Sequence, residues 1–185
     1  DTSRDAIKGA EVFGSIKRGY VSRKSTEDII ARSVLGSAEL GSFLTPSQVL
    51  NYVEAHDNYN LYDLLSYVHP NDSKEQIKKQ VEVATAMNLL FQGMAFMQVG
   101  QEFLRTKLVA TGPDGEVTAQ DRERAMNSYN APDAVNQVDW NLVSVNKDTI
   151  EYIRQIIHLK KTLPALSLES YEEIYQHVFV HTADM

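Results

Sequence analysis

The feature that most constrains the fold is an alternation of strand and helix patterns between residues 49 and 99. Residues Val49 to Ala55 are rich in β-branched and aromatic side chains, and the polar sequence His56-Asp57-Asn58 follows directly. This pattern predicts a buried strand that ends in a loop. Met94 to Val99 is a second apolar run, which Gly100-Gln101-Glu102 ends. Two strands are therefore expected, each followed by a polar cluster.

A helix is predicted between these two strands, from Ser73 to Gly93. Ser73 is suited to cap its N-terminus, with Gln76 three residues later, and Gly93 is suited to end it. Apolar residues recur at helical spacing in this segment, at positions Ile77, Val81, Ala84, Met87, Leu90 and Phe91. The order of strand, helix and strand is typical of a parallel α/β fold.

The remaining segments predict further elements around this unit. Ser25 to Gly36 is expected to form a short amphipathic helix, with Ser25 and Asp28 at the spacing of a capping box. Asp148 to Lys161 is expected to form another helix. The long polar stretch from 102 to 146 is expected to be a loop, and such loops are usually functional or disordered. Ile174 to Val180 is expected to be a strand.

The length of the chain limits how these elements can be assembled. In a (β/α)₈ barrel, the loops after the strands build the active site, which matches the position of the polar clusters. Such a barrel needs about 250 residues, whereas this chain has 185. It is therefore either a small open α/β sheet or a piece of a larger barrel.

Composition excludes several classes of function. A formal net charge of −7 argues against a nucleic-acid-binding protein, and no apolar run approaches the length of a membrane span. The absence of cysteine excludes disulfides and thiolate metal sites. Glu54, His56 and Asp57 alternate between strand faces, and the loops around Asp121 and Asp139 match no calcium-binding motif. We therefore assign no metal-ligating residue and no cofactor, and the sequence leaves calcium binding by the loops around Asp121 and Asp139 open.

Three segments carry the residues with chemical potential. His56, Asp57 and Asn58 can all hydrogen-bond vicinal hydroxyls of a sugar, although the same residues are also common in plain turns. The second segment is Val99 to Lys107, and the third is Asn127 to Trp140 within the long loop. Mixed Asn, Tyr, Asp and Trp side chains are typical of carbohydrate contacts and of ordered surface loops alike.

Together and in this order, the sequences AHDN, GQEFLRTK and NSYNAPDAVNQVDW resemble type I pullulanases of the α-amylase superfamily. The resemblance covers nearly the whole chain. It implies hydrolysis of α-1,6-glucosidic branch linkages in pullulan, glycogen and starch-derived branched dextrins. It also implies that residues 1–164 form the C-terminal portion of the catalytic (β/α)₈ barrel, with about strands seven and eight and their helices. Residues 165–185 would begin a C-terminal β-sandwich domain.

The resemblance also implies roles for individual residues. Asp57 matches the third catalytic carboxylate of the family, which holds sugar hydroxyls beside the scissile bond. Tyr129 is expected to be either a platform for a sugar ring or a packed loop aromatic. The candidates for substrate binding are His56, Asn58, Tyr59, Tyr129, Asp133 and Asn136.

The segment alone is expected to be inactive. Retaining glycosidases need a nucleophile and a general acid about 5–5.5 Å apart, and Asp57 and Glu102 could be considered for that pair. The resemblance instead implies that both groups lie upstream of residue 1. Glu102 is then expected to make a structural hydrogen bond or an ion pair with Arg105 or Lys107. The expected partners are the rest of the catalytic domain or further copies of the segment.

Two rival interpretations remain at this point. One is another α-glucan hydrolase of the same superfamily, of the isoamylase or debranching type. The other is a non-catalytic glycan-binding module. The resemblance favours a secreted or cell-surface protein and leaves a cytoplasmic one open.

Overall fold

The chain is mainly helical, with two pairs of short strands. The computed structural model describes residues 2–12, 15–37 and 43–181. The helices are α1 (Thr2–Lys8), α2 (Glu27–Val34), α3 (Leu61–Val68), α4 (Lys74–Leu90), α5 (Ala119–Met126), α6 (Asp133–Asn136), α7 (Asn141–Val145), α8 (Lys147–Thr162) and α9 (Tyr171–His177). The strands are β1 (Gly9–Val12), β2 (Ser15–Arg18), β3 (Leu50–Asn51) and β4 (Met94–Ala95). Over these described ranges, no helix has the length and apolarity that a bilayer span requires.

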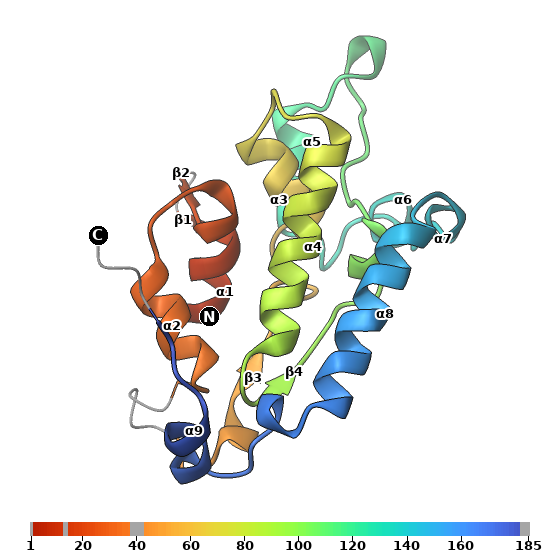
Figure 1. Cartoon of the computed structure of the whole chain (residues 1–185). Helices are drawn as coiled ribbons and strands as arrows, with labels where there is room; N and C mark the ends of the chain where they lie inside the picture. The colour runs from red at the N-terminus through yellow and green to blue at the C-terminus, as the bar shows by residue number, and fades with distance from the viewer. Residues whose placement is uncertain (1, 13–14, 38–42, 182–185) are drawn as a thin grey trace.

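Helix α4 runs through the middle of the molecule (Figure 1) and packs against α3, α8 and α1. The predicted helix start is confirmed: Gln76 N–H donates to the Ser73 hydroxyl, and the Gln76 side chain accepts from Ser73 N–H at 2.7 Å. Gly93 lies just beyond the end of α4 with φ +98, and a Cβ there would come within 2.9 Å of the Pro46 and Val49 carbonyl oxygens. Glycine is therefore needed where the chain turns from α4 into β4.

Strands β3 and β4 pair in parallel, which confirms the predicted strand, helix, strand order. Leu50 lies opposite Met94, and Asn51 opposite Ala95. Both strands are much shorter than predicted, since regular pairing does not extend to Ala55 or Val99. A strand is assigned only where a neighbour supplies hydrogen bonds, and β3 and β4 have only each other in the described structure.

The two sides of β3 have different environments, whereas both residues of β4 are exposed. Asn51 and Val53 are buried on the side of the helices. Leu50 and Met94 point to the other side and remain about half exposed, at 52% and 50%, and Phe96 on the same side is also exposed. We call Leu50, Tyr52, Met94 and Phe96 the open face.

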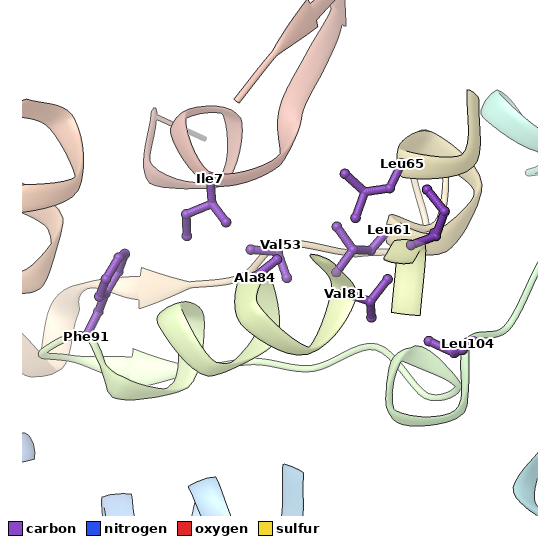
Figure 2. Packing of buried hydrophobic residues seen from close by; sticks show 9 residues of the cluster. Ile7, Val53, Leu61, Leu65, Val81, Ala84, Phe91 and Leu104 are labelled. Carbon is purple, nitrogen blue, oxygen red and sulfur yellow. The ribbon is translucent and has the colours of Figure 1, made fainter. Parts of the chain in front are cut away.

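The main hydrophobic core lies between α1, α3 and α4. Figure 2 shows Val53, which follows β3, between Ile7 of α1 and Ala84 of α4. The α3 residues Leu61 and Leu65 complete this contact with Val81, and Phe91 and Leu104 extend the cluster at its ends. The core therefore fixes the segment after β3, which carries His56 and Asp57, against three helices.

Two predictions at the ends of the chain need correction. Ile174 to Val180 is not a strand: α9 occupies Tyr171–His177, because Ser170 and Glu173 form a capping box at its start. The predicted helix at 25–36 is confirmed as α2, but its N-cap is Thr26, and the Ser25 hydroxyl donates to Glu27 instead.

The long segment from 102 to 146 is not wholly irregular, since it contains α5, α6 and α7. Helix α5 begins at a capping box of Thr118 and Asp121, and Asp121 also accepts from the Thr111 hydroxyl at 2.7 Å. These bonds hold the pKa of Asp121 well below its usual range. The loop is therefore ordered by its own polar side chains, which place residues 127–140 beside the ends of β3 and β4.

Candidate active site

His56 and Asp57 lie on the surface directly beyond β3. Their side chains are 83% and 75% exposed, and His56 Nε2 lies 3.7 Å from Asp57 Oδ2. Glu54, two residues earlier, is buried and accepts from Leu61 N–H at 2.7 Å. The chain therefore turns outward between Glu54 and His56, which separates the buried Glu54 side chain from the exposed His56 and Asp57, so the three do not form one site.

A cavity of about 350 Å³ adjoins Asp57. Its lining comes from three segments that are far apart in the sequence: the loop after β3, the segment after β4, and the long loop. The lining residues are His56, Asp57, Asn60, Gln98, Val99, Arg105, Lys107, Ser128, Tyr129, Asn136 and Val138. Among the described residues that line it, no second carboxylate accompanies Asp57.

Asn58 and Tyr59, which were predicted to bind substrate, do not line this cavity. Asn58 is exposed beside a smaller hollow, lined also by Arg4 and Lys8, and has a left-handed backbone with φ +64. Tyr59 is buried, with its ring 6.1 Å from that of Tyr67. The Tyr59 side chain therefore packs inside the protein rather than on the rim.

The candidates from the long loop are also divided. Tyr129 lines the cavity and is 81% exposed, so it is not a packed loop aromatic. Asn136 lines the cavity as well, but its amide donates to the carbonyls of Ser128 at 2.7 Å and Ala131 at 3.2 Å. Asp133 lies exposed at the start of α6 and is not among the lining residues.

Arg105 also lines the cavity, although the sequence predicted it only as a possible partner of Glu102. It is buried, and its Nη2 donates to the Asn136 carbonyl at 2.5 Å. Gly100 has φ +101, and a Cβ there would lie 2.6 Å from Arg105 Cβ. The glycine after β4 therefore makes room for this arginine, which joins the end of β4 to the long loop.

Lys107 is the second such residue and is almost fully buried. Its ammonium donates to the carbonyls of Asn58 at 2.6 Å and His56 at 3.3 Å, and to the Ser128 hydroxyl at 3.2 Å. Burial lowers the pKa of Lys107, and the nearby Asp63 carboxylate opposes that shift. The signal that could have identified both cations is their position immediately beyond the end of a predicted strand.

Buried ionisable groups lie beneath the rim. Asp63 accepts from the Thr106 hydroxyl at 2.5 Å and from Lys107 N–H at 2.8 Å, yet burial raises the pKa of its carboxyl to about 6. Burial also raises the pKa of Glu54 and lowers that of Lys8, although each charge partly offsets the shift of the other. Within the described structure, Glu54 Oε1 has no hydrogen-bond partner. Burial therefore shifts the titration of all three groups toward their neutral forms.

Glu102 makes the structural hydrogen bond that was one of its two predicted roles. Its Oε2 accepts from Gly100 N–H at 3.0 Å, within the turn that follows β4. The predicted ion pair with Arg105 or Lys107 does not form among the described residues, because both cations donate to backbone carbonyls instead.

The cavity can bind a polar, hydroxyl-bearing ligand. Asp57 can accept two or more hydrogen bonds, His56 can donate or accept, and the exposed ring of Tyr129 offers an apolar face. No group of three or more His, Asp or Glu side chains placed to hold a metal ion occurs in the described part of the chain.

Comparisons with known proteins bear on this geometry. No protein-family model matches the chain. The pullulanase of Bacillus subtilis strain 168 is 32% identical over 183 residues, which cover 96% of this chain and 23% of that protein. Pullulanase A of Streptococcus pneumoniae is 26% identical over 220 residues. The chain spans about a quarter or less of the length of these curated relatives.

Solved structures of pullulanases are also similar to this chain. The pullulanase of Anoxybacillus sp. LM18-11 in complex with maltotetraose has a TM-score of 0.83 and 33% identity over 99% of this chain, which corresponds to 24% of that one. The pullulanase type I of Bacillus subtilis strain 168 in complex with maltose has a TM-score of 0.82 and 31% identity. The chain is a homologue of the pullulanases and corresponds to about a quarter of their length.

Proposed function

We propose that this chain is a segment of a type I pullulanase, a glycoside hydrolase that cleaves α-1,6-glucosidic branch linkages in pullulan and related α-glucans. The observation that carries the proposal is the convergence of three sequence segments on one cavity beside Asp57. The relatives support it, because each is named a pullulanase, and the solved neighbours include complexes with maltotriose, maltotetraose and maltohexaose.

In this proposal Asp57 orients the sugar rather than attacking it. An exposed carboxylate at the cavity rim can accept hydrogen bonds from two neighbouring hydroxyls of one glucose unit. Such bonds strengthen as the ring distorts toward the oxocarbenium-like transition state. A retaining mechanism also needs a nucleophile and a general acid about 5–5.5 Å apart. Both would come from the remainder of the protein.

His56, Tyr129 and Asn136 would contribute to binding from the same cavity. His56 lies next to Asp57 and can hydrogen-bond the same glucose unit. Tyr129 exposes a ring on which a sugar can stack, and Asn136 orders the loop that carries it. Three further candidates would support the site from outside the cavity. Tyr59 would do so by packing in the interior, and Asn58 and Asp133 from exposed positions near the cavity.

We further propose that β3 and β4 are strands seven and eight of a (β/α)₈ barrel formed by residues 1–164 and the rest of the protein. The open face supports this, since barrel interiors are filled by apolar side chains from neighbouring strands. Residues 165–185 would begin the C-terminal domain, although 165–181 contain helix α9 instead of the expected strand. Residues 1 and 182–185 lie outside the described structure.

The direct test is Asp57→Asn in the full-length protein that carries this segment. We expect kcat on pullulan to fall at least about 100-fold, because hydrogen bonds of this kind supply several kcal/mol in the transition state. The fold should be unchanged, since asparagine keeps the size of an exposed side chain.

The matched control is Asp114→Asn, in the long loop between residues 102 and 146. Asp114 is exposed, does not line the cavity, and has φ +58, which asparagine tolerates. This control should keep parental turnover. Near-parental turnover of Asp57→Asn would refute the role of Asp57.

The isolated segment should show no turnover on pullulan, even at high protein concentration. The cavity lined by described residues offers one carboxylate where the reaction needs a nucleophile and an acid besides it. Release of reducing sugar by the purified segment, abolished by Asp57→Asn, would overturn this part of the proposal.

A further inference from the structure

Lys107 contacts the backbone on both sides of Asp57 and also the Ser128 hydroxyl, farther along the long loop. We propose that Lys107 is a positioning residue for the proposed reaction: its buried ammonium holds the backbone carbonyls of His56 and Asn58, one on each side of Asp57, and the Ser128 hydroxyl in one arrangement. This inference rests on the proposed function. It adds a residue that acts through Asp57: Lys107 lines the cavity, but its ammonium donates to three protein oxygens.

The first argument is the set of partners of the ammonium. Lys107 Nζ donates to the His56 carbonyl, which belongs to the peptide that enters Asp57, and to the Asn58 carbonyl, one residue beyond it. The Asp57 side chain itself is 75% exposed, and His56 Nε2 lies 3.7 Å from its Oδ2. The position of the carboxylate therefore depends mainly on its backbone, which Lys107 holds on both sides.

The second argument is backbone conformation. Asn58 has φ +64, a left-handed conformation that asparagine tolerates better than most residues but that still needs contacts to select it over the extended and helical alternatives. The shorter of the two carbonyl contacts, 2.6 Å, is made to this residue. Without the ammonium, the turn at 57–58 would lose the contact that favours this conformation, and Asp57 would sample other orientations.

The third argument is the link to the opposite wall of the cavity. Lys107 Nζ also donates to the Ser128 hydroxyl, and the Ser128 carbonyl accepts from the Asn136 amide. Arg105 in turn donates to the Asn136 carbonyl. One connected network therefore relates Asp57 to the loop that presents Tyr129, so that both sides of the cavity keep a constant separation.

A lysine is suited to this place because its ammonium has three donors and no acceptor, and it finds three oxygens here. The charge is held in the interior by Asp63, which contacts the Lys107 N–H, and by the more distant carboxylates of Glu54 and Asp57. A neutral side chain of similar length would leave the carbonyls of His56 and Asn58 without this donor.

The experiment is a double-mutant cycle of Lys107→Met and Asp57→Asn in the full-length protein. Alone, Lys107→Met should lower kcat on pullulan about 10- to 100-fold, as expected for a misplaced catalytic group, with a much smaller change in KM. In the Asp57→Asn background the same substitution should cost less than about 3-fold, since the group it positions is already lost.

The control is Lys160→Met at the far end of α8. The Lys160 ammonium likewise donates to two carbonyls, of Phe91 at 2.7 Å and Leu166 at 2.5 Å, but it does not line the cavity. It should lower stability without lowering kcat. If Lys107→Met acted only by lowering stability, as Lys160→Met should, its effect on kcat would be the same with and without the Asp57 carboxylate.

The outcomes separate the two proposals. If Asp57→Asn keeps its activity, the proposed function fails, and this inference fails with it. If Asp57→Asn is impaired but Lys107→Met costs the same factor in both backgrounds, the positioning role alone is overturned. If Lys107→Met does not fold, Ser128→Ala replaces it in the cycle.

For Ser128→Ala, a few-fold loss of kcat that disappears in the Asp57→Asn background supports the inference. An equal loss of kcat in both backgrounds overturns it.

Discussion

Single buried side chains beneath the rim give the chain a defined response to pH. Asp63 is fully buried, and its carboxyl pKa is raised to about 6 because burial outweighs its hydrogen bonds to Thr106 and Lys107. A native state that binds a proton more tightly than the unfolded chain is stabilised where that proton is bound. The contribution of Asp63 to the free energy of unfolding is therefore complete below about pH 4 and is lost as the pH rises through about 6.

We expect Asp63→Asn to make the free energy of unfolding less dependent on pH between about pH 4 and pH 7. In the parental chain the free energy of unfolding should lose on the order of 2 to 3 kcal/mol from this group between about pH 4 and pH 7. The variant cannot titrate there, so the difference in stability between the two proteins should shrink as the pH rises. Urea unfolding at several pH values measures this. A difference that stays constant with pH would contradict the assignment.

Helix ends contribute to stability at the scale of elements, and the cap of α4 was predicted correctly from the sequence. Ser73→Ala removes the hydroxyl that caps α4, the helix that packs against α1, α3 and α8. We expect it to lower the free energy of unfolding by about 1 kcal/mol.

Ser25→Ala is the matched control for that substitution. Ser25 was predicted to cap α2, but in the structure its hydroxyl bonds only the exposed Glu27 side chain. We expect a change well below that of Ser73→Ala in the same urea titration. Equal losses would mean that the cap at α4 contributes nothing beyond an exposed hydrogen bond.

The sequence predicted α2, α4, α8 and the order of β3 and β4 because the signals are local: caps, helical spacing and β-branched runs. It missed α9, although Ser170 and Glu173 have the spacing of a capping box. It overestimated the strands because their length depends on neighbours that no local pattern reveals.

The candidate site was predictable only in part, for a similar reason. Asp57, His56 and Tyr129 stand in recognisable motifs and do line one cavity. The roles of Arg105 and Lys107 depend on backbone carbonyls of Asn136, His56 and Asn58, which become neighbours only after folding. Tyr59 was placed at the rim by its sequence neighbours, whereas its apolar ring is buried with Tyr67 close by.

At the scale of the molecule, the open face predicts self-association of the isolated segment. Leu50, Met94 and Phe96 are exposed together, and no further described strand pairs with β3 or β4. Size-exclusion chromatography over a concentration series should show species larger than a monomer.

Met94→Lys should shift that equilibrium toward the monomer, since charge on an open strand opposes pairing. Val145→Lys, at an exposed apolar residue of α7, should leave it unchanged. A parental segment that remains monomeric throughout the series would show that the open face does not require a cover.

The central claim is that Asp57 contacts a glucose unit at the rim of a shared active site. The most direct measurement is a crystal structure of the full-length protein with a bound maltooligosaccharide. We predict that a carboxylate oxygen of Asp57 lies about 2.5–3.0 Å from a sugar hydroxyl, in the cavity that Tyr129 and Asn136 also line. A sugar bound in the active site with Asp57 facing solvent, beyond hydrogen-bonding distance, would contradict it.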